Sequence, residues 1–510
     1  MADEQTKPTV AGDAAPGAGR EGEREADKKL RQTVERLLLR PPAVSDGSVT
    51  ATAGRGPLRY EARVEFLPVM AQGFDGVLAE PQAAVMVTSY KRQGVRAADR
   101  PVCFAFNGGP GSASLWLHLG ALGPKRVLVP DDGGAARAPY ALVDNPQTWF
   151  DHFDLVFIDP PHTGWSVCAS EAARKRMLGV DGDVEALGEV IRVWLTRHQR
   201  WASPVVLAGE SYGTTRAAAL ADSLQTAGVA LSGLVLISCA MDLQALDFTP
   251  ANELPYALFL PAFANVSQYH GLLQGPLAAS PEAARAAAEA FVADDYLAAL
   301  HAGHRLDGAK RERIAARVAE LTGLPRALVE AKNLRISDHV YFTEAMRAQG
   351  RLMGRLDARV TGPMAAVRSH EWEFDPGIES IAPAYTASAL GYFSQALGVN
   401  LETRYEAFNL GAHKAWNWNR GDANGNGFAC TTPDLARALR RNPHLRVLVA
   451  SGRYDLGTPY SASDWSLAHL DVPPDVAARI EHHYYDAGHM MYTRSADLGK
   501  LKADLSRWLG

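Results

Sequence analysis

The segment Gly209-Glu210-Ser211-Tyr212-Gly213 directly follows the apolar run 205–208 and precedes a helical stretch at 214–226. A serine with glycine two residues away on each side, placed at a strand end, is typical of a sharp strand-to-helix turn. Bulky side chains at the glycine positions would collide with neighbouring backbone, and glycine also tolerates strained dihedral angles. Such a turn presents the Ser211 hydroxyl on a rigid tip. The segment therefore indicates a nucleophile, with an ordinary tight turn as the alternative.

Short, fully apolar runs bounded by turn residues recur along the chain. Such runs suit strands of a parallel sheet that is covered on both faces. The runs lie at 102–106, 155–158, 205–208, 234–238, 446–450 and 480–485. Residues 180–200 carry helical periodicity between two of them. The sequence predicts an α/β fold with a mostly parallel central sheet flanked by helices, entered through two antiparallel strands at 59–68 and 83–90.

The sheet pattern is interrupted by residues 245–425, which are dominated by helical sequence with many aromatic residues. A helical block between two parts of one sheet predicts a cap insertion over the site. At 510 residues the chain exceeds the usual size of a single core. We expect a charged, disordered tail at 1–40 that becomes helical over 27–40. The predicted core occupies 41–244 and 426–510, with the cap at 245–425.

Composition excludes several classes of function. The net charge of −5 is small for this length and argues against a nucleic-acid partner. No stretch reaches the roughly 20 apolar residues that span a bilayer, so no membrane partner is expected. Residues 1–35 lack the apolar core of a signal peptide, which predicts a cytoplasmic protein, although a non-classical export route would leave no trace here. Oligomeric state stays open.

The four cysteines are scattered and show no paired spacing, so neither a disulfide framework nor a zinc site is indicated. The spacing of histidines likewise shows no metal-binding motif such as H-E-x-x-H. We expect neither a metal nor a cofactor.

A serine nucleophile needs a general base and an acidic residue that orients the base. In α/β-hydrolases these follow the serine in the order Asp or Glu, then His, each in a loop after a strand. Asp455 follows the strand run 446–450, and His489 follows the run 480–485. Order and loop placement together predict Asp455 as orienting carboxylate and His489 as base. The alternative candidates are Asp471, Asp475 and Asp486 for the acid, and His482 and His483 for the base.

Acyl transfer develops an oxyanion that needs preorganised N–H donors. One donor is expected from Tyr212, the residue after the serine. The other is expected from the loop Asn107-Gly108-Gly109-Pro110-Gly111, which directly follows the strand run 102–106. A phosphate-binding loop is the alternative. It is disfavoured because no Gly-Lys-Ser/Thr follows and Pro110 lacks an amide proton.

Four segments of the chain resemble signature blocks of the serine carboxypeptidase family, within the α/β-hydrolase superfamily. They are Phe106-Asn107-Gly108-Gly109-Pro110-Gly111-Ser112, Gly209-Glu210-Ser211-Tyr212-Gly213, Gly488-His489-Met490, and the stretch from Asn145-Pro146-Gln147-Thr148-Trp149 through Thr163-Gly164-Trp165-Ser166. The resemblance spans roughly 55–240 and 440–500 and suggests a bacterial-type member without a signal peptide.

The resemblance implies roles for individual residues. The implied nucleophile, orienting acid and base are Ser211, Asp455 and His489, and the implied oxyanion donors are the Gly109 and Tyr212 amides. The family reads the free carboxylate of a peptide substrate with residues that correspond here to Asn107, Gly108 and Glu210. A glutamate can hydrogen-bond a carboxylate only if one of the two is protonated, which favours acidic pH.

The chain departs from the family pattern at two positions. Ala121 stands where secreted members carry a second glutamate, and Ser112 replaces a cysteine, so the family's disulfide there is absent. The first change leaves Glu210 without its acidic partner and brings an acidic pH optimum into question. We predict a serine-type carboxypeptidase that acts on peptides with a free C-terminus. The alternatives are an esterase or acyltransferase, an aminopeptidase-like enzyme (proline iminopeptidases share the Gly-Gly-Pro-Gly loop), and a catalytically silent binding protein.

Overall fold

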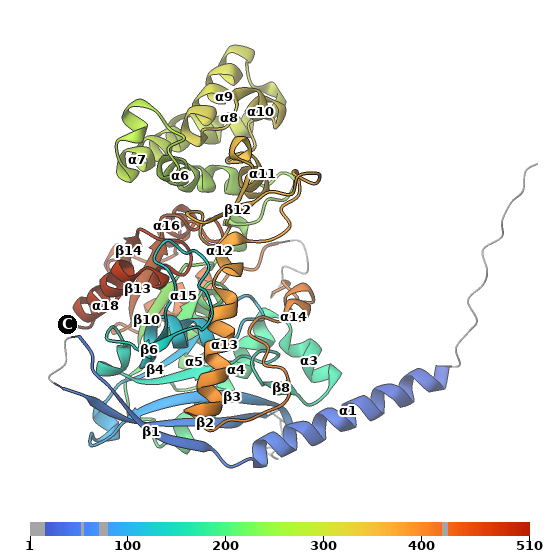
Figure 1. Cartoon of the computed structure of the whole chain (residues 1–510), viewed down its shortest axis with the longest axis vertical. Coiled ribbons are helices and arrows are strands. Elements are labelled where there is room, and N and C mark those ends of the chain that lie inside the picture. Colours follow the sequence, from blue (N-terminus) through green and yellow to red (C-terminus); the bar gives the residue numbers. More distant parts are fainter. Residues whose placement is uncertain (1–15, 53–55, 71–79, 421–426) are drawn as a thin grey trace, which may run out of the picture.

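The computed structural model describes residues 16–52, 56–70, 80–420 and 427–510, and its centre is a sheet of ten strands (Figure 1). The strand order is β1-β2-β3-β7-β4-β9-β10-β13-β14, and β8 pairs with β3. The bounds are β1 Ala43–Val49, β2 Leu58–Met70, β3 Pro81–Arg92, β4 Val102–Phe106, β7 Asp154–Ile158, β8 Val167–Cys168, β9 Val205–Glu210, β10 Leu231–Ile237, β13 Arg446–Gly452 and β14 Ile480–Tyr485. Six neighbouring strands, β7, β4, β9, β10, β13 and β14, pair in parallel. The pairings of β1, β2, β3 and β8, and that of β3 with β7, are antiparallel. The predicted α/β fold is confirmed.

Both faces of the sheet are buried, because alternate side chains of each central strand enter opposite cores. In β9, Val205 and Leu207 pack on one side, while Val206 and Ala208 pack on the other. The first core contains residues of α4 (Val180–Arg197), α5 (Tyr212–Thr226) and α15 (Thr432–Arg441). The second contains residues of α13 (Ala382–Gln395) and α18 (Ser495–Leu509). The remaining helices around the sheet are the short α2 Leu115–Leu117, α3 Glu171–Met177, α12 Pro376–Glu379, α14 Leu410–Lys414, α16 Tyr460–Ala468 and α17 Pro474–Ala477.

Six helices form a body of their own beyond the carboxyl ends of the strands (Figure 1). They are α6 Leu254–Tyr269, α7 Pro281–Phe291, α8 Leu297–Ala302, α9 Gly308–Thr322, α10 Arg326–Ala331 and α11 Asp338–Glu344. Local signals delimit them: the Asp307 side chain caps the start of α9, and Gly323 ends it in the left-handed conformation. These helices share a hydrophobic core that also includes Tyr454, Leu456 and Tyr460 from the second part of the sheet domain.

The insertion predicted at 245–425 is therefore divided. Its helical body occupies 254–344, and the chain then returns through the small hairpin β11 (Arg351–Met353) and β12 (Thr361–Pro363). Helix α13, within the same predicted block, packs on the core of the sheet instead. The sequence of α13 predicts a helix whether it packs on the cap or on the sheet. Only the surface that it covers shows that it belongs to the core of the sheet.

The N-terminal segment forms helix α1 (Pro16–Leu39). The helix expected over 27–40 is present to Leu39, and the disorder expected before it is wrong over 16–26; residues 1–15 lie outside the described residues. Glu, Lys, Arg and Ala are strong helix formers, which explains a helix that begins well before the predicted residue 27. Val34 and Leu37 bury against the sheet. In the part of the chain that the structure describes, none of the helices is long and apolar enough for a membrane span.

The serine turn and the loop after β4 are in direct backbone contact. Ser211 has φ 60° and ψ −131°, the strained conformation expected at such a turn. A Cβ built on Gly209 would lie 2.2 Å from the carbonyl oxygen of Gly213. One built on Gly108 would lie 2.4 Å from the Tyr212 nitrogen. Only glycine permits these approaches.

This contact yields a prediction for stability. Gly108→Ala should destabilise the fold by about 3 kcal/mol, because its methyl group would overlap the first backbone nitrogens of α5, which cannot yield. Gly391→Ala is the matched control, since its methyl group would meet nothing within 4 Å and helix α13 would gain about 0.5 to 1 kcal/mol. Urea denaturation of both variants checks the difference; equal stabilities would contradict it.

Candidate active site

The structure brings Asp455 and His489 into direct contact. His489 Nδ1 lies 2.7 Å from Asp455 Oδ2, and both side chains are buried. The other lone pairs of the carboxylate are also occupied: Oδ1 accepts from the Gly457 and Thr458 amides at 2.8 and 3.0 Å, and Oδ2 accepts from Thr458 Oγ1 at 2.8 Å. Asp455 is thereby fixed in the orientation that positions an imidazole.

Electrostatics favour a protonated imidazolium at His489. Burial lowers the pKa of His489, but the negative charge of Asp455 and its hydrogen bond more than offset this, and the net pKa lies above the usual 6.5. A base with a raised pKa holds an abstracted proton more firmly, which is the property that a serine hydrolase needs during attack.

Ser211 and His489 are each hydrogen-bonded to the end of β10. The Ser211 amide donates to the Ile237 carbonyl at 2.9 Å, and the hydroxyl of the next residue, Ser238, donates to the His489 carbonyl at 2.6 Å. No hydrogen bond joins the Ser211 hydroxyl to the His489 ring within the described structure. Catalytic hydrogen bonds of this kind commonly tighten only when substrate is bound.

A cavity of about 410 Å³ opens beside Ser211. Gly109 and Tyr212, the predicted oxyanion donors, line it together with Ser211. Tyr212 begins α5, so its amide belongs to the helix N-terminus, where the helix dipole favours negative charge. Thr458 also lines the cavity, with Asp455 and His489 behind it.

The side chains of two predicted carboxylate readers, Asn107 and Glu210, are bonded to each other. Asn107 Nδ2 donates to Glu210 Oε1 at 2.8 Å, and Asn107 Oδ1 accepts from the Leu117 amide at 3.0 Å. Both side chains are buried, and neither lines the cavity, although the backbone of Gly108 contacts Tyr212. Ala121 is fully buried in the apolar core. In this structure Asn107 and Glu210 bind each other.

Glu210 is a buried acid with an unsatisfied oxygen. Within the described residues, its Oε2 has no hydrogen-bond partner. Burial raises the pKa of Glu210 to about 7, although His489, Tyr492 and Asn107 partly offset the rise. The carboxyl therefore carries a proton through the acidic range and loses it near neutrality.

Comparison with known proteins identifies the family pattern. Residues 86–242 match the model of the serine carboxypeptidase family. The predicted resemblance is confirmed. A prohormone-processing carboxypeptidase, Kex1(Δ)p of Saccharomyces cerevisiae, has a similar fold, with a TM-score of 0.52 at 13% identity over 88% of this chain and 91% of that one. No curated protein sequence matches this chain.

Other solved hydrolases resemble the chain less closely than Kex1(Δ)p. A proline iminopeptidase of Mycobacterium smegmatis has a TM-score of 0.34 at 12% identity, over 91% of this chain and 97% of that one. A thermostable carboxyl esterase of Bacillus coagulans has a TM-score of 0.35 at 11% identity, over 87% and 97%.

Four charged or titratable residues outside the serine carboxypeptidase motifs also line the cavity, and the sequence did not indicate them. They are Asp247, Asp338, Arg355 and His413. The negative charge of Asp338 contributes, after burial, to a raised pKa of Asp247, so the two acids lie near each other. All four come from the insertion, where no local motif signals them. Thr458 had a usable signal, since a hydroxyl three residues after an aspartate commonly bonds it.

The root of the insertion, residues 354–360, supports the loops that carry Asp455 and His489. The Leu456 and His489 amides donate to the carbonyls of Arg355 and Leu356 at 3.0 and 2.6 Å. The Ala358 amide donates in return to the Tyr454 carbonyl at 2.9 Å. The loops that carry Asp455 and His489 thus hold their positions by bonding to the returning chain of the cap.

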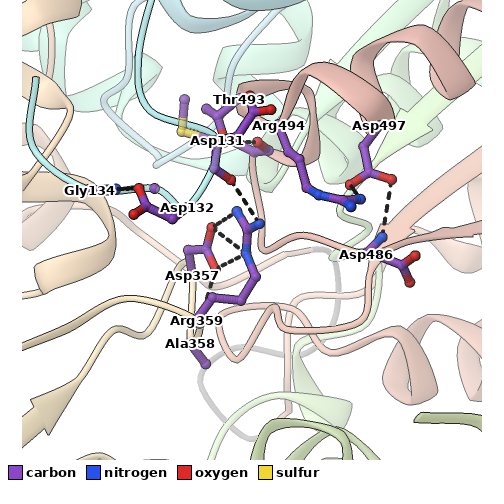
Figure 2. Close-up of polar contacts among 12 residues, drawn as sticks. Asp131, Asp132, Gly134, Asp357, Ala358, Arg359, Asp486, Thr493, Arg494 and Asp497 are labelled. Atoms are coloured by element: carbon purple, nitrogen blue, oxygen red, sulfur yellow. Dashed lines mark hydrogen bonds and ion pairs between the residues drawn. The ribbon is translucent and has the colours of Figure 1, made fainter. Parts of the chain in front are cut away.

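Ion pairs secure this root (Figure 2). Arg359 donates to both oxygens of Asp357 and, at 3.1 Å, to the Asp131 carbonyl. Close by, Arg494 pairs with Asp497 at 2.9 Å, and Asp497 accepts from the amide of Asp486, three residues before His489. Both sides of the histidine loop are anchored by charged groups.

A second Ser-His-Asp arrangement lies nearby. His482 bonds Asp464 Oδ1 through Nδ1 and Ser451 Oγ through Nε2, both at 2.9 Å. Ser451 is fully buried inside β13 and has ordinary strand geometry, so no substrate can reach it. Ser211 differs from Ser451 in two ways: it lines a cavity, and it lies on a strained turn.

The first site prediction concerns the pair Asp455–His489. Covalent labelling of Ser211 by a fluorophosphonate should rise with pH, with a midpoint above 6.5, because the His489 pKa is raised and only the neutral ring accepts a proton. Asp455→Asn should slow the reaction about 10³- to 10⁴-fold and lower the midpoint. Ser211→Ala is the control that must not label. A midpoint that Asp455→Asn leaves unchanged would contradict the pairing.

The second prediction concerns Glu210 and stability. Its folded pKa of about 7 lies above its ordinary 4.5, so the folded state binds more protons than the unfolded state between these values. Stability therefore falls as pH rises through this window, by about 3 kcal/mol in total. Glu210→Gln should remove the decline and be the more stable protein at pH 8, but not at pH 4.5. Urea denaturation at both pH values tests this, with Glu330→Gln on the surface of α10 as the control; parallel pH profiles for wild type and Glu210→Gln would contradict it.

Proposed function

We propose that the chain is a serine-type carboxypeptidase that hydrolyses C-terminal peptide bonds through an acyl-enzyme. The observation that carries the proposal is the 2.7 Å contact between buried Asp455 and His489, beside the cavity that holds Ser211. The serine carboxypeptidase match over 86–242 supports the same reaction.

In the proposed mechanism, Ser211 Oγ attacks the scissile carbonyl while His489 takes its proton. The Gly109 and Tyr212 amides stabilise the negative oxygen of the tetrahedral intermediate. His489 then gives its proton to the leaving amine, which departs with the C-terminal residue. Water attacks the remaining acyl group with His489 again as base and restores the free serine.

An aminopeptidase-like enzyme is the second candidate. The observation in its favour is the pair of carboxylates, Asp247 and Asp338, that line the cavity. A substrate with a free amino group would place a cation beside them. The same nucleophile and base serve both reactions, so only the substrate distinguishes them.

A substrate panel decides between the candidates. We expect hydrolysis of an N-blocked dipeptide with a free C-terminal carboxylate, at least about tenfold faster in kcat/KM than its C-terminal amide, because a recognised charge contributes about 1.5 kcal/mol or more. A dipeptide amide with a free N-terminus and a simple ester complete the panel, with Ser211→Ala as the blank. Preference for the free N-terminus would support the aminopeptidase; hydrolysis of the ester alone would support an esterase.

A further inference from the structure

Arg355 lines the cavity beside Ser211, and its backbone is fixed on both sides. Its amide donates to Asp375 Oδ1 at 2.9 Å, and its carbonyl accepts from the Leu456 amide at 3.0 Å. Asp375 is buried and also accepts from the Leu356 and Gly377 amides. The side chain therefore starts from a rigid point at the root of the insertion.

The guanidinium of Arg355 is partly buried but has no carboxylate within 4 Å among the described residues. Two buried arginines elsewhere in the fold show the usual arrangement, Arg359 paired with Asp357 and Arg216 with Asp183. A guanidinium offers a planar fork of N–H donors that matches a carboxylate in bidentate fashion. An unpaired one inside a cavity is equipped for an anionic group of a ligand.

The charge of Arg355 also reaches the catalytic groups. Like burial, it opposes the rise in the pKa of His489 that Asp455 produces. It also adds to the lowering of the His413 pKa that burial causes. Its Cζ would lie 3.6 Å from a Cβ on Gly457, the residue whose amide bonds Asp455. Arg355 thus faces the same space as the serine from the side of the acid loop.

We propose that Arg355 binds the free α-carboxylate of the peptide substrate and so determines carboxypeptidase specificity. The inference rests on the proposed function. In an extended peptide the carboxylate lies only one residue, roughly 3.5 Å of chain, beyond the scissile bond, so both groups fit one cavity. Asn107 and Glu210 bond each other outside that cavity, and Ala121 offers no second acid. Among the described residues that line the cavity, Arg355 is the one lysine or arginine.

The two modes of carboxylate recognition differ in their pH dependence. A guanidinium stays charged throughout the accessible pH range. If Arg355 binds the carboxylate, the KM of the enzyme for a peptide with a free C-terminus should therefore be constant between pH 6 and 8.5. Recognition by Glu210 requires a proton and would weaken as pH rises past its pKa of about 7. His413, Asp247 and Asp338 also line the cavity, and their titration would affect both substrates. The KM of the C-terminal amide is therefore measured at every pH, and the two KM values are compared.

The experiment compares wild type with Arg355→Gln and Arg355→Lys. For the N-blocked dipeptide, Arg355→Gln should raise KM about 10- to 100-fold with kcat little changed, the loss expected for one hydrogen bond between charged groups. Arg355→Lys should restore part of the affinity. Hydrolysis of the C-terminal amide and of an ester reports any effect of the lost charge on His489, so the ratio of KM for the free carboxylate to KM for the amide should rise by about the same 10- to 100-fold. Arg368→Gln, an exposed arginine of the same insertion paired with Glu371, is the matched control.

An independent arm keeps the inference separate from the proposed function. An N-blocked amino acid with a free carboxylate is tested as a competitive inhibitor of ester hydrolysis, and Arg355→Gln should weaken it by the same factor. Wild type that cleaves no peptide but is inhibited through Arg355 would refute the carboxypeptidase and support the anion site. An unchanged KM and inhibition constant in Arg355→Gln, with fluorophosphonate labelling intact, would overturn the inference.

Discussion

Three backbone segments meet at the serine turn with no side chain between them, and the rest of the site depends on this contact. Gly108, Gly209 and Gly213 each stand where a Cβ would lie within 3 Å of backbone atoms. The approach brings the loop after β4 against the first amides of α5, so that Gly109, Ser211 and Tyr212 share one cavity.

A buried charge pair stabilises the contact between the loop after β4 and the start of α5. Arg216 on α5 donates to Asp183 on α4 at 2.7 Å and to the Asn107 carbonyl at 2.6 Å. Its guanidinium also lies over the rings of Phe106 and Tyr212, with centroids 5.3 and 5.2 Å away. Because an unpaired charge would be costly in this interior, the loop and the two helices are held in one arrangement.

The sequence predicted the sheet and the triad candidates because each rests on a local, periodic signal. Strands β9, β13 and β14 end at one edge of a parallel sheet, so the residues after them had to converge. The packing of α13 and the role of Arg355 could not be predicted in this way. A helical period does not say which surface a helix covers, and a lone arginine in a short hairpin turn resembles any surface arginine. Ser451, His482 and Asp464 show the converse, since the right residue types come together without access for a substrate.

The root at 354–360 defines which part of this enzyme could be exchanged as a module. Its amides and carbonyls complete the loops that carry Asp455 and His489, so it is a working part of the hydrolase core although it lies within the insertion. The helical body at 254–344 supports the acid loop through side chains instead, because Tyr454 and Leu456, on either side of Asp455, belong to its hydrophobic core. In a chimera, a cut made at the hairpin would remove the backbone support of the loops that carry Asp455 and His489 along with the cap. A graft at the two ends of the helical body would keep that support, but the new helices would have to cover Tyr454 and Leu456.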